Sequence, residues 1–247
     1  MGVKLSVIIP GYNEEKNLKK GVLDEVYNYL KGVDYEYEVL IVDDGSKDRT
    51  REIVKEQIKG KKGFRLIENP HGGKANTVIT GLLLAEGEIA LFTDMDQATP
   101  LPEIEKFLPK FEEGADVVIG KRSGRKGAPL SRQIAAWGFA FLRNLILGLP
   151  FKDTQCGFKA FNKLAREAIF PKIKDDWGVV HTGGGAVNAG FDVEVLFFAK
   201  KLKFNIKEVE VEWLHPGTSQ VRVIKDSLAA IYDMFRIRLN DISGKYN

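Results

Sequence analysis

The 247-residue sequence contains little cysteine and little histidine. Its single cysteine, Cys156, excludes an intramolecular disulfide and fits a reducing compartment, and we expect the thiol to be buried rather than nucleophilic. The three histidines, His71, His181 and His215, are scattered without the spacing of metal ligands, and no Ser-His-Asp set is evident. We therefore interpret the histidines as structural, with His215 as a weak site candidate.

The sequence also lacks a long apolar run and a strong net charge. Its most apolar stretch, residues 134–149, is interrupted by Arg143, so no segment reaches the roughly 18 residues that a membrane span requires. No signal-peptide pattern precedes the first strand, and we expect a cytoplasmic location. A net charge of +3 gives no general affinity for nucleic acid. The length suits a single domain, 1–247, made of two halves, 1–122 and 123–247.

Short apolar strands alternate with helical patterns along the first half of the chain. This alternation predicts an α/β fold with a mainly parallel central sheet flanked by helices. Strands are expected at 5–10, 37–43, 64–68, 88–94, 115–120, 153–162 and 204–213. Helices are expected at 14–30, 48–59, 73–87, 101–113, about 131–147, 191–202 and about 219–240, with a Gly-rich loop at 175–190.

Polar residues follow four of the predicted strands. Because parallel sheets bind ligands outside the carboxyl ends of their strands, these residues are expected to share one site. They are Pro10 to Glu14, Asp43 to Ser46, Asp94 to Gln97, and Gly120 to Arg122.

Two acidic turns carry the chemistry of this predicted site. Asp94 and Asp96 are two residues apart at the end of a strand, so both carboxylates can face one hard cation such as Mg²⁺. The alternatives are a solvated turn or a helix N-cap, and we favour metal and diphosphate binding because a second acidic turn lies opposite. In that turn, we favour Asp43 as a nucleotide ligand. For Asp44, a structural role in the turn and a role in ligand binding are equally well supported.

Gly72, Gly73 and Lys74 precede a predicted helix without the spacing of a P-loop or of a Rossmann fingerprint. We therefore interpret the glycine pair as a tight strand-to-helix turn rather than a phosphate cradle. The absence of both spacings weighs against a kinase or a dehydrogenase function.

Residues 121–152 form a basic block with seven cationic and no acidic side chains. Arg122 and Arg132 are its candidates for phosphate recognition, since arginine presents a fork of donors. A solvated surface loop is the plain alternative. We favour a phosphate-bearing amphiphile because the block adjoins the most apolar helix. The final helix is amphipathic too, and it can lie in a membrane interface or pack on the sheet.

Several motifs together resemble glycosyltransferases of family 2, which have the nucleotide-diphospho-sugar (GT-A) fold. The resemblance spans nearly the whole chain and is weakest at 171–190. It is carried by "SVIIPGYNEEKNL", "VLIVDDGSKDRT", "TDMDQAT", "IGKRS" and "DTQCGFKAF". Within the family, "GFDVEVLFFAKK" is more similar to dolichyl-phosphate glucosyltransferases than to the mannosyltransferases.

The resemblance implies inverting, metal-dependent transfer of a hexose from UDP-glucose or GDP-mannose to dolichyl or another polyprenyl phosphate. The half at 1–122 would bind the nucleotide sugar and the half at 123–247 the acceptor, with peripheral attachment to the cytoplasmic face of a membrane. The implied nucleotide-sugar ligands are Pro10, Tyr12, Glu14, Asp43 and Asp94, and the implied Mg²⁺ or Mn²⁺ ligands are Asp94, Asp96 and Gln97. Asp96, Arg122 and Arg132 are the implied catalytic residues.

On the acceptor side we expect Asp192, Glu194, Ser219 and Arg222, where "GTSQVR" departs from the family's Gly-Ser-Lys. Transfer to a saccharide or other hydroxyl is an alternative that requires a base, with Asp192 or Glu194 as candidates. A sugar nucleotidyltransferase would need a Gly-rich signature that "PGYNEE" does not supply. A binding protein that has lost catalysis is a further alternative, which the intact acidic pair and the intact arginines disfavour. The sequence leaves open which sugar is transferred (glucose or mannose), which nucleotide carries it (UDP or GDP) and which metal is bound (Mg²⁺ or Mn²⁺).

Overall fold

A seven-stranded sheet forms the centre of the computed structural model, which describes residues 2–123, 130–178, 189–214 and 223–246, with backbone alone at 130–137, 175–178, 189 and 223–229. The strand order is β3-β2-β1-β4-β6-β5-β7, and every neighbouring pair is parallel except the two pairs made by β6. The strands are β1 (Leu5–Gly11), β2 (Tyr37–Asp43), β3 (Phe64–Glu68), β4 (Ile89–Phe92), β5 (Val117–Arg122), β6 (Lys159–Asn162) and β7 (Ile206–Val211). The predicted α/β class with a mainly parallel sheet is confirmed.

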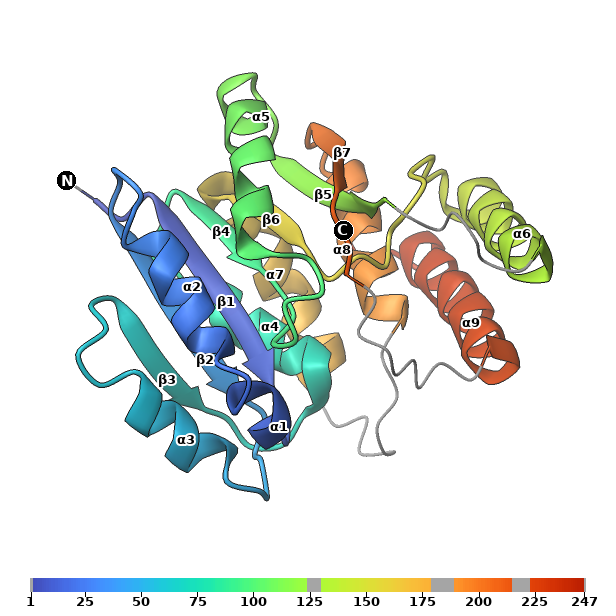
Figure 1. Ribbon diagram of the computed structural model, residues 1–247. Coiled ribbons are helices and arrows are strands. Elements are labelled where there is room, and N and C mark those ends of the chain that lie inside the picture. The colour runs from blue at the N-terminus through green and yellow to red at the C-terminus, as the bar shows by residue number, and fades with distance from the viewer. Residues whose placement is uncertain (1, 124–129, 179–188, 215–222, 247) are drawn as a thin grey trace.

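Helices cover both faces of the sheet, and alternate residues of each central strand enter two separate cores (Figure 1). Val7 and Ile9 of β1 pack with one helical layer, whereas Ile8 between them packs with the other. The first layer comprises α1 (Glu15–Leu18), α2 (Val22–Leu30), α3 (Thr50–Gln57), η1 (Leu101–Lys106) and α5 (Leu108–Glu112). The second comprises α4 (Gly73–Leu84), α7 (Lys163–Gly178) and α8 (Ala189–Lys201).

The structure corrects several predicted boundaries. The helix predicted at 14–30 divides at Gly21, whose φ of 87° lies in the left-handed region that ends α1 and begins α2. The helix predicted at 101–113 divides into η1 and α5. The strand predicted at 153–162 is only Lys159–Asn162, because Asp153 and the residues after it turn toward β5.

Helix α7 was missed by the sequence reading, which expected a loop from residue 175 onward. Its buried side chains, Ala165, Ile169 and Ile173, recur every four residues along one face, which is a helical signal. Pro171 inside the helix weakens that signal. Of the rest of the predicted loop, residues 179–188 lie outside the described residues, and residues 189–190 begin α8.

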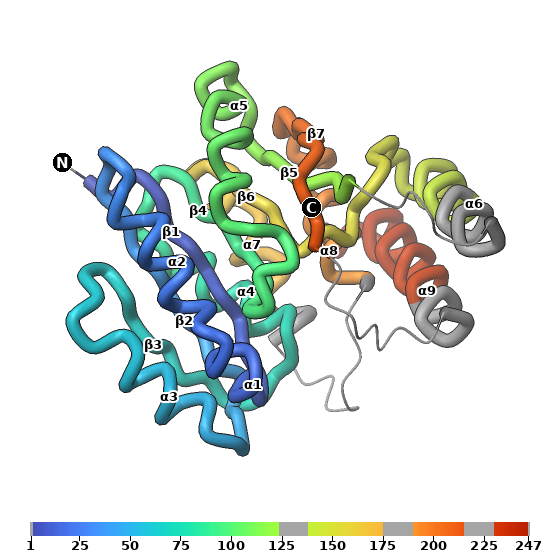
Figure 2. The backbone as a smooth tube through the Cα atoms, viewed as in Figure 1, coloured from blue at the N-terminus to red at the C-terminus, as the bar shows by residue number. Residues whose placement is uncertain are grey.

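Helices α6 (Leu130–Leu147) and α9 (Val223–Ile242) pack against each other at the end of the molecule beyond β5 and β7 (Figure 2). Met234 and Ile237 of α9 are buried in the core that also holds α8. Among the described residues, no helix combines the length and the apolarity needed to cross a bilayer.

Candidate active site

The turns that follow β1 and β2 are joined by hydrogen bonds at the carboxyl edge of the sheet. Asn13, at a φ of 55° that asparagine tolerates well, accepts a hydrogen bond from the Lys47 amide at 2.8 Å and donates its own amide to Ser46 Oγ at 2.9 Å. The Glu14 amide donates to Thr50 Oγ1 at 2.7 Å. These bonds fix the backbone on which Tyr12 and Glu14 stand.

Asp44 connects the turn after β2 to the turn that begins α4. Its carboxylate accepts the amides of Gly72 at 2.8 Å and Gly73 at 3.0 Å, and its Oδ2 lies 2.9 Å from His71 Nδ1. The glycine amides are thus occupied by a side chain of the protein, which agrees with a tight turn rather than a phosphate cradle. Asp44 therefore organises the site, and it also lines it.

Asp43 is the most enclosed acid at this edge, with a side chain only 1 % exposed. Its Oδ2 accepts the amides of Ser46 at 3.0 Å and Gly45 at 3.1 Å. Its Oδ1 is buried and has no hydrogen-bond partner within the described part of the chain. A buried acceptor without a donor is costly, so this oxygen is well suited to receive an N–H from a ligand.

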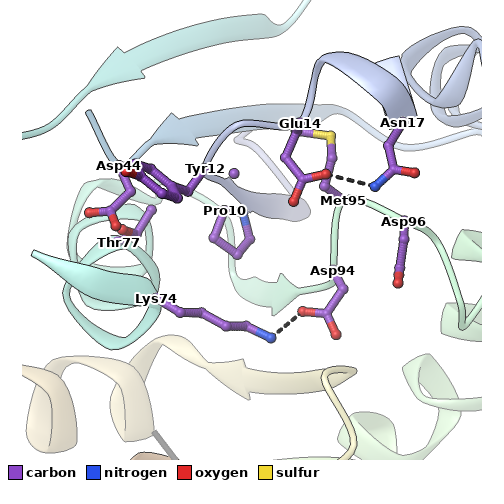
Figure 3. A pocket seen from close by; sticks show the side chains of 11 residues that line it. Pro10, Tyr12, Glu14, Asn17, Asp44, Lys74, Thr77, Asp94, Met95 and Asp96 are labelled. Atoms are coloured by element: carbon purple, nitrogen blue, oxygen red, sulfur yellow. Dashed lines mark hydrogen bonds and ion pairs between the residues drawn. The ribbon is translucent and has the colours of Figure 1, made fainter. Parts of the chain in front are cut away.

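A pocket of about 320 Å³ opens among these turns (Figure 3). Tyr12 stacks on His71 at its rim, with ring centroids 4.5 Å apart, and offers a planar surface. The pocket is lined by Pro10, Gly11, Tyr12, Glu14, Asn17, Asp44, Lys74, Thr77, Asp94, Met95 and Asp96. It thus combines an aromatic surface with four carboxylates, as a polar ligand that brings its own cation would require.

The predicted Asp94 and Asp96 do reach one pocket from the turn after β4, separated by the buried Met95. Asp94 forms an ion pair with Lys74, and Asp96 accepts the Ala98 amide at 3.0 Å. Gly157 makes room for Asp94, because a Cβ at that position would lie 2.1 Å from Asp94 Oδ2.

Electrostatics in the pocket favour a bound cation. Burial raises the pKa of Glu14 above its ordinary value, the carboxylates of Asp96 and Asp94 raise it further, and a hydrogen bond from Asn17 opposes the rise. Four carboxylates line the pocket, and this donor set fits a divalent ion. No group of three or more acidic, histidine or cysteine ligands forms among the described residues, so Asp94 and Asp96 would leave further ligand positions to a substrate.

Arg122 lies near the pocket but is held by a carboxylate. Its Nε and Nη2 donate to the two oxygens of Asp153 at 2.6 and 2.9 Å, and its guanidinium lies 5.6 Å from the Trp213 ring centroid. Together with Asp94 and Gln155 it lines a second, smaller pocket of about 50 Å³. Arg132 belongs to α6, but its side chain is outside the described set.

Two of the predicted residues, Gln97 and Glu194, have protein partners that differ from their expected roles. The side-chain amide of Gln97 donates to the backbone carbonyl of Asp94 at 2.9 Å, and Gln97 lines neither pocket, so it braces the turn and is not placed as a metal ligand. Glu194 is fully buried, with Arg236 at 3.0 Å and the Tyr246 hydroxyl as partners, so it joins α8 to α9 rather than facing an acceptor.

Of the remaining residues predicted on the acceptor side, the structure describes one and leaves two undescribed. Asp192 stands in the first turn of α8 and pairs with Lys159 at 2.6 Å. Lys159 is fully buried, and its ammonium lies 5.3 Å from the Phe92 ring centroid. Ser219 and Arg222 lie outside the described residues.

Lys74, His71 and Thr77 were not predicted to belong to the site. Lys74 is the important omission, since it comes from the first turn of α4 and contacts Asp94 twenty residues later. The sequence signal for Lys74 was its position directly after the glycine pair. A turn that brings the start of α4 to the strand ends also brings the first side chains of α4 to the site.

Comparison with known proteins agrees with this geometry. The pattern of "Glycosyl transferase family 2" matches residues 6–170. A "Dolichyl-phosphate beta-glucosyltransferase" from Dictyostelium discoideum is 32 % identical and covers 98 % of this chain and 76 % of its own, and the Homo sapiens protein of that name is 30 % identical over 98 % and 77 %. The crystal structure of Mycobacterium tuberculosis glucosyl-3-phosphoglycerate synthase with Mn²⁺, UDP and glucosyl-3-phosphoglycerate superposes with a TM-score of 0.63, at 19 % identity over 95 % and 80 % of the two chains. The chain has a GT-A fold and belongs to glycosyl transferase family 2.

Proposed function

We propose that this glycosyltransferase transfers glucose from UDP-glucose to dolichyl or another polyprenyl phosphate, with inversion at the anomeric carbon. The relatives carry the name dolichyl-phosphate beta-glucosyltransferase over almost the whole length of this chain. The observation that carries the proposal is the pocket at the strand ends. Tyr12 and the Asp94–Asp96 pair line this one pocket.

The nucleotide would occupy the side of the pocket formed by β1 and β2. A uracil ring carries an N–H that the unpartnered Asp43 Oδ1 would accept, and Tyr12 would stack on the ring. Pro10 leaves no amide to donate at the pocket wall, and Glu14 stands further along the same turn. A guanine base also offers an N–H, so GDP-mannose is the alternative donor.

Asp94 and Asp96 would hold a divalent cation, Mg²⁺ or Mn²⁺, together with the diphosphate of the donor. The four carboxylates that line the pocket support a cation at this point. When bound, such an ion would neutralise the departing nucleotide diphosphate as a Lewis acid. The Mycobacterium tuberculosis enzyme was crystallised with Mn²⁺ and UDP, and we extend that donor chemistry to this chain.

Attack by a phosphate acceptor requires orientation more than proton removal, because a phosphate is already ionised at neutral pH. Arg122, Arg132 and Arg222 are the proposed cationic residues for the acceptor phosphate, with Ser219 nearby in sequence. Arg122 is anchored by Asp153 beside Asp94, so its guanidinium would meet the acceptor in a fixed orientation. Asp192, held by Lys159, would be the base only if the acceptor were a hydroxyl.

The acceptor's polyprenyl chain would place the enzyme on a membrane surface. Six apolar side chains on α6 and α9 are each more than half exposed, and their spacing of three to four residues forms one stripe on each helix. They are Phe141, Leu145, Tyr232, Phe235, Leu239 and Ile242. We propose that this stripe rests in the interface of the cytoplasmic leaflet, so that attachment is peripheral.

The test offers UDP-glucose and GDP-mannose in parallel to purified protein with dolichyl phosphate, with dolichol as the matched acceptor that lacks the phosphate. Transfer of glucose to dolichyl phosphate alone, with a β-linked product by NMR, is the expected result. Transfer of mannose would show that GDP-mannose is the donor, and the proposed class of reaction would be unchanged. Glucose on dolichol would show a hydroxyl acceptor, and no transfer from either donor would contradict the proposal.

A further inference from the structure

Lys74 is the one positively charged residue lining the 320 Å³ pocket among the described residues, where it faces Glu14, Asp44, Asp94 and Asp96. It projects from the first turn of α4, and its ammonium contacts Asp94 across the pocket (Figure 3). The side chain is 43 % exposed, so it is free to change rotamer without disturbing the core.

The ion pair has a direct consequence for cation binding. Asp94 Oδ1 already holds the ammonium, and Asp94 Oδ2 faces Gly157, where even a methyl group would not fit. A divalent ion shared by Asp94 and Asp96 must therefore compete with Lys74 for Asp94. A lysine side chain is ordinarily charged at neutral pH, so the group that competes for Asp94 is itself a cation.

The charge of the donor supplies a second role for the displaced ammonium. A nucleoside diphosphate is strongly anionic, and the four carboxylates of the pocket repel it. Lysine carries a compact charge on a flexible stem, so the same group can leave a carboxylate and meet a phosphate.

We infer that Lys74 is an exchangeable counter-ion: it neutralises Asp94 in the free protein, a divalent cation displaces it, and the donor diphosphate then receives it. The second half of this inference rests on the proposed function. The first half concerns only the chain and a cation.

The exchange predicts that Lys74→Met has opposite effects on two ligands. Without a competing ammonium, Mn²⁺ alone should bind about tenfold more tightly than to the wild type, measured by calorimetric titration in the absence of nucleotide. With Mn²⁺ saturating, UDP should bind about tenfold more weakly, because the diphosphate loses its lysine partner.

Two variants separate exchange from a general change of charge. Lys16→Met removes one charge from an exposed position of α1, beside the pocket-lining Asn17, and both affinities should stay within about twofold. Lys74→Arg keeps the positive charge. Its affinities for Mn²⁺ alone and for UDP with saturating Mn²⁺ should therefore stay close to those of the wild type. Thermal unfolding of each variant checks that the fold is intact.

Equal Mn²⁺ affinity in wild type and Lys74→Met, including no measurable binding to either, would overturn the inference. Tighter Mn²⁺ binding with unchanged UDP affinity would also overturn it, since the ammonium would have no second partner. If wild-type protein binds Mn²⁺ but no nucleotide, the proposed function fails while the competition at Asp94 is still measured.

Discussion

At the scale of single residues, the site concentrates carboxylates that have different tasks. Asp44 holds backbone amides and His71, whereas Asp43 keeps one oxygen unpartnered among the described residues. Asp94 and Asp96 remain accessible to the pocket. The same side-chain type thus builds the turn at Asp44, whereas for Asp43 we propose contact with the nucleotide and for Asp94 and Asp96 a bound cation.

Asp96→Ala should reduce turnover by at least about 100-fold, because a cation held by Asp94 alone would no longer be fixed against the diphosphate. Asp96 is exposed, so the free energy of unfolding should change by less than about 0.5 kcal/mol. Asp34→Ala, at another exposed acid, is the matched control. A near-normal rate for the Asp96 variant with metal present would contradict the assignment.

Glu14→Gln should stabilise the protein at neutral pH. The pKa of Glu14 is raised from 4.5 in the folded state, first by burial and then by Asp96 and Asp94, so folding favours its protonated form. Ionised Glu14 therefore destabilises the fold once the pH exceeds the raised pKa. The variant should gain less than about 1 kcal/mol near pH 7.

Urea unfolding without divalent ions, at about pH 4, 5.5 and 7, measures this effect. The difference between variant and wild type should shrink toward pH 4, where Glu14 is mostly protonated in both states. A difference that stays constant with pH would show that the effect arises from packing and not from titration.

At the scale of elements, a buried ionic contact fastens α8 to α9. Glu194 is fully buried, with Arg236 and Tyr246 as partners, and burial, together with Glu194, raises the pKa of Tyr246 above its ordinary value. This contact holds the helix that carries the exposed apolar stripe against the helix that carries Asp192. It therefore links the proposed membrane surface to the site.

Arg236→Met should lower the free energy of unfolding by about 3 kcal/mol, because it leaves a buried carboxylate without its cation. Arg238→Met on the same helix removes an exposed pair with Asp241 and should cost less than about 0.5 kcal/mol. Chemical denaturation of both variants makes the comparison. Equal losses would mean that the buried contact is no stronger than a surface one.

At the scale of the whole molecule, the helices α6 and α9, which carry the exposed apolar side chains, pack against each other at one end. Leu239→Glu should weaken binding to anionic phospholipid vesicles at least about tenfold in a flotation assay, since a charge would replace an exposed apolar group that is proposed to enter the membrane interface. Leu164→Glu, at an equally exposed leucine on α7, is the control and should bind like wild type. Equal loss in both variants would contradict the proposed orientation.

Activity on a short, water-soluble prenyl phosphate separates docking from chemistry. Leu239→Glu should retain its rate on that acceptor and lose rate on dolichyl phosphate in vesicles. Loss on both acceptors would place Leu239 in the structure of the site rather than on the membrane.

Local pattern was sufficient for much of the fold and for the centre of the site. Buried strands followed by polar turns predicted the sheet edge, and the spacing of Asp94 and Asp96 predicted that both would reach one pocket. The division into halves at residue 122 and the roles of Arg132, Ser219 and Arg222 stay predictions. Helix α7 was within reach of the same reasoning, since its buried residues have helical spacing.

The sequence by itself thus determined the strands, the acidic turns and the family. Only the tertiary structure decided which partners the charged residues meet: Asp153 for Arg122, Lys74 for Asp94, Arg236 for Glu194. It also decided that β6 runs antiparallel between β4 and β5, and which face of α9 is buried. The reason is physical. Burial and turn propensity act between neighbours in sequence, whereas a charge chooses its partner, and a strand its neighbour, among residues that only folding brings together.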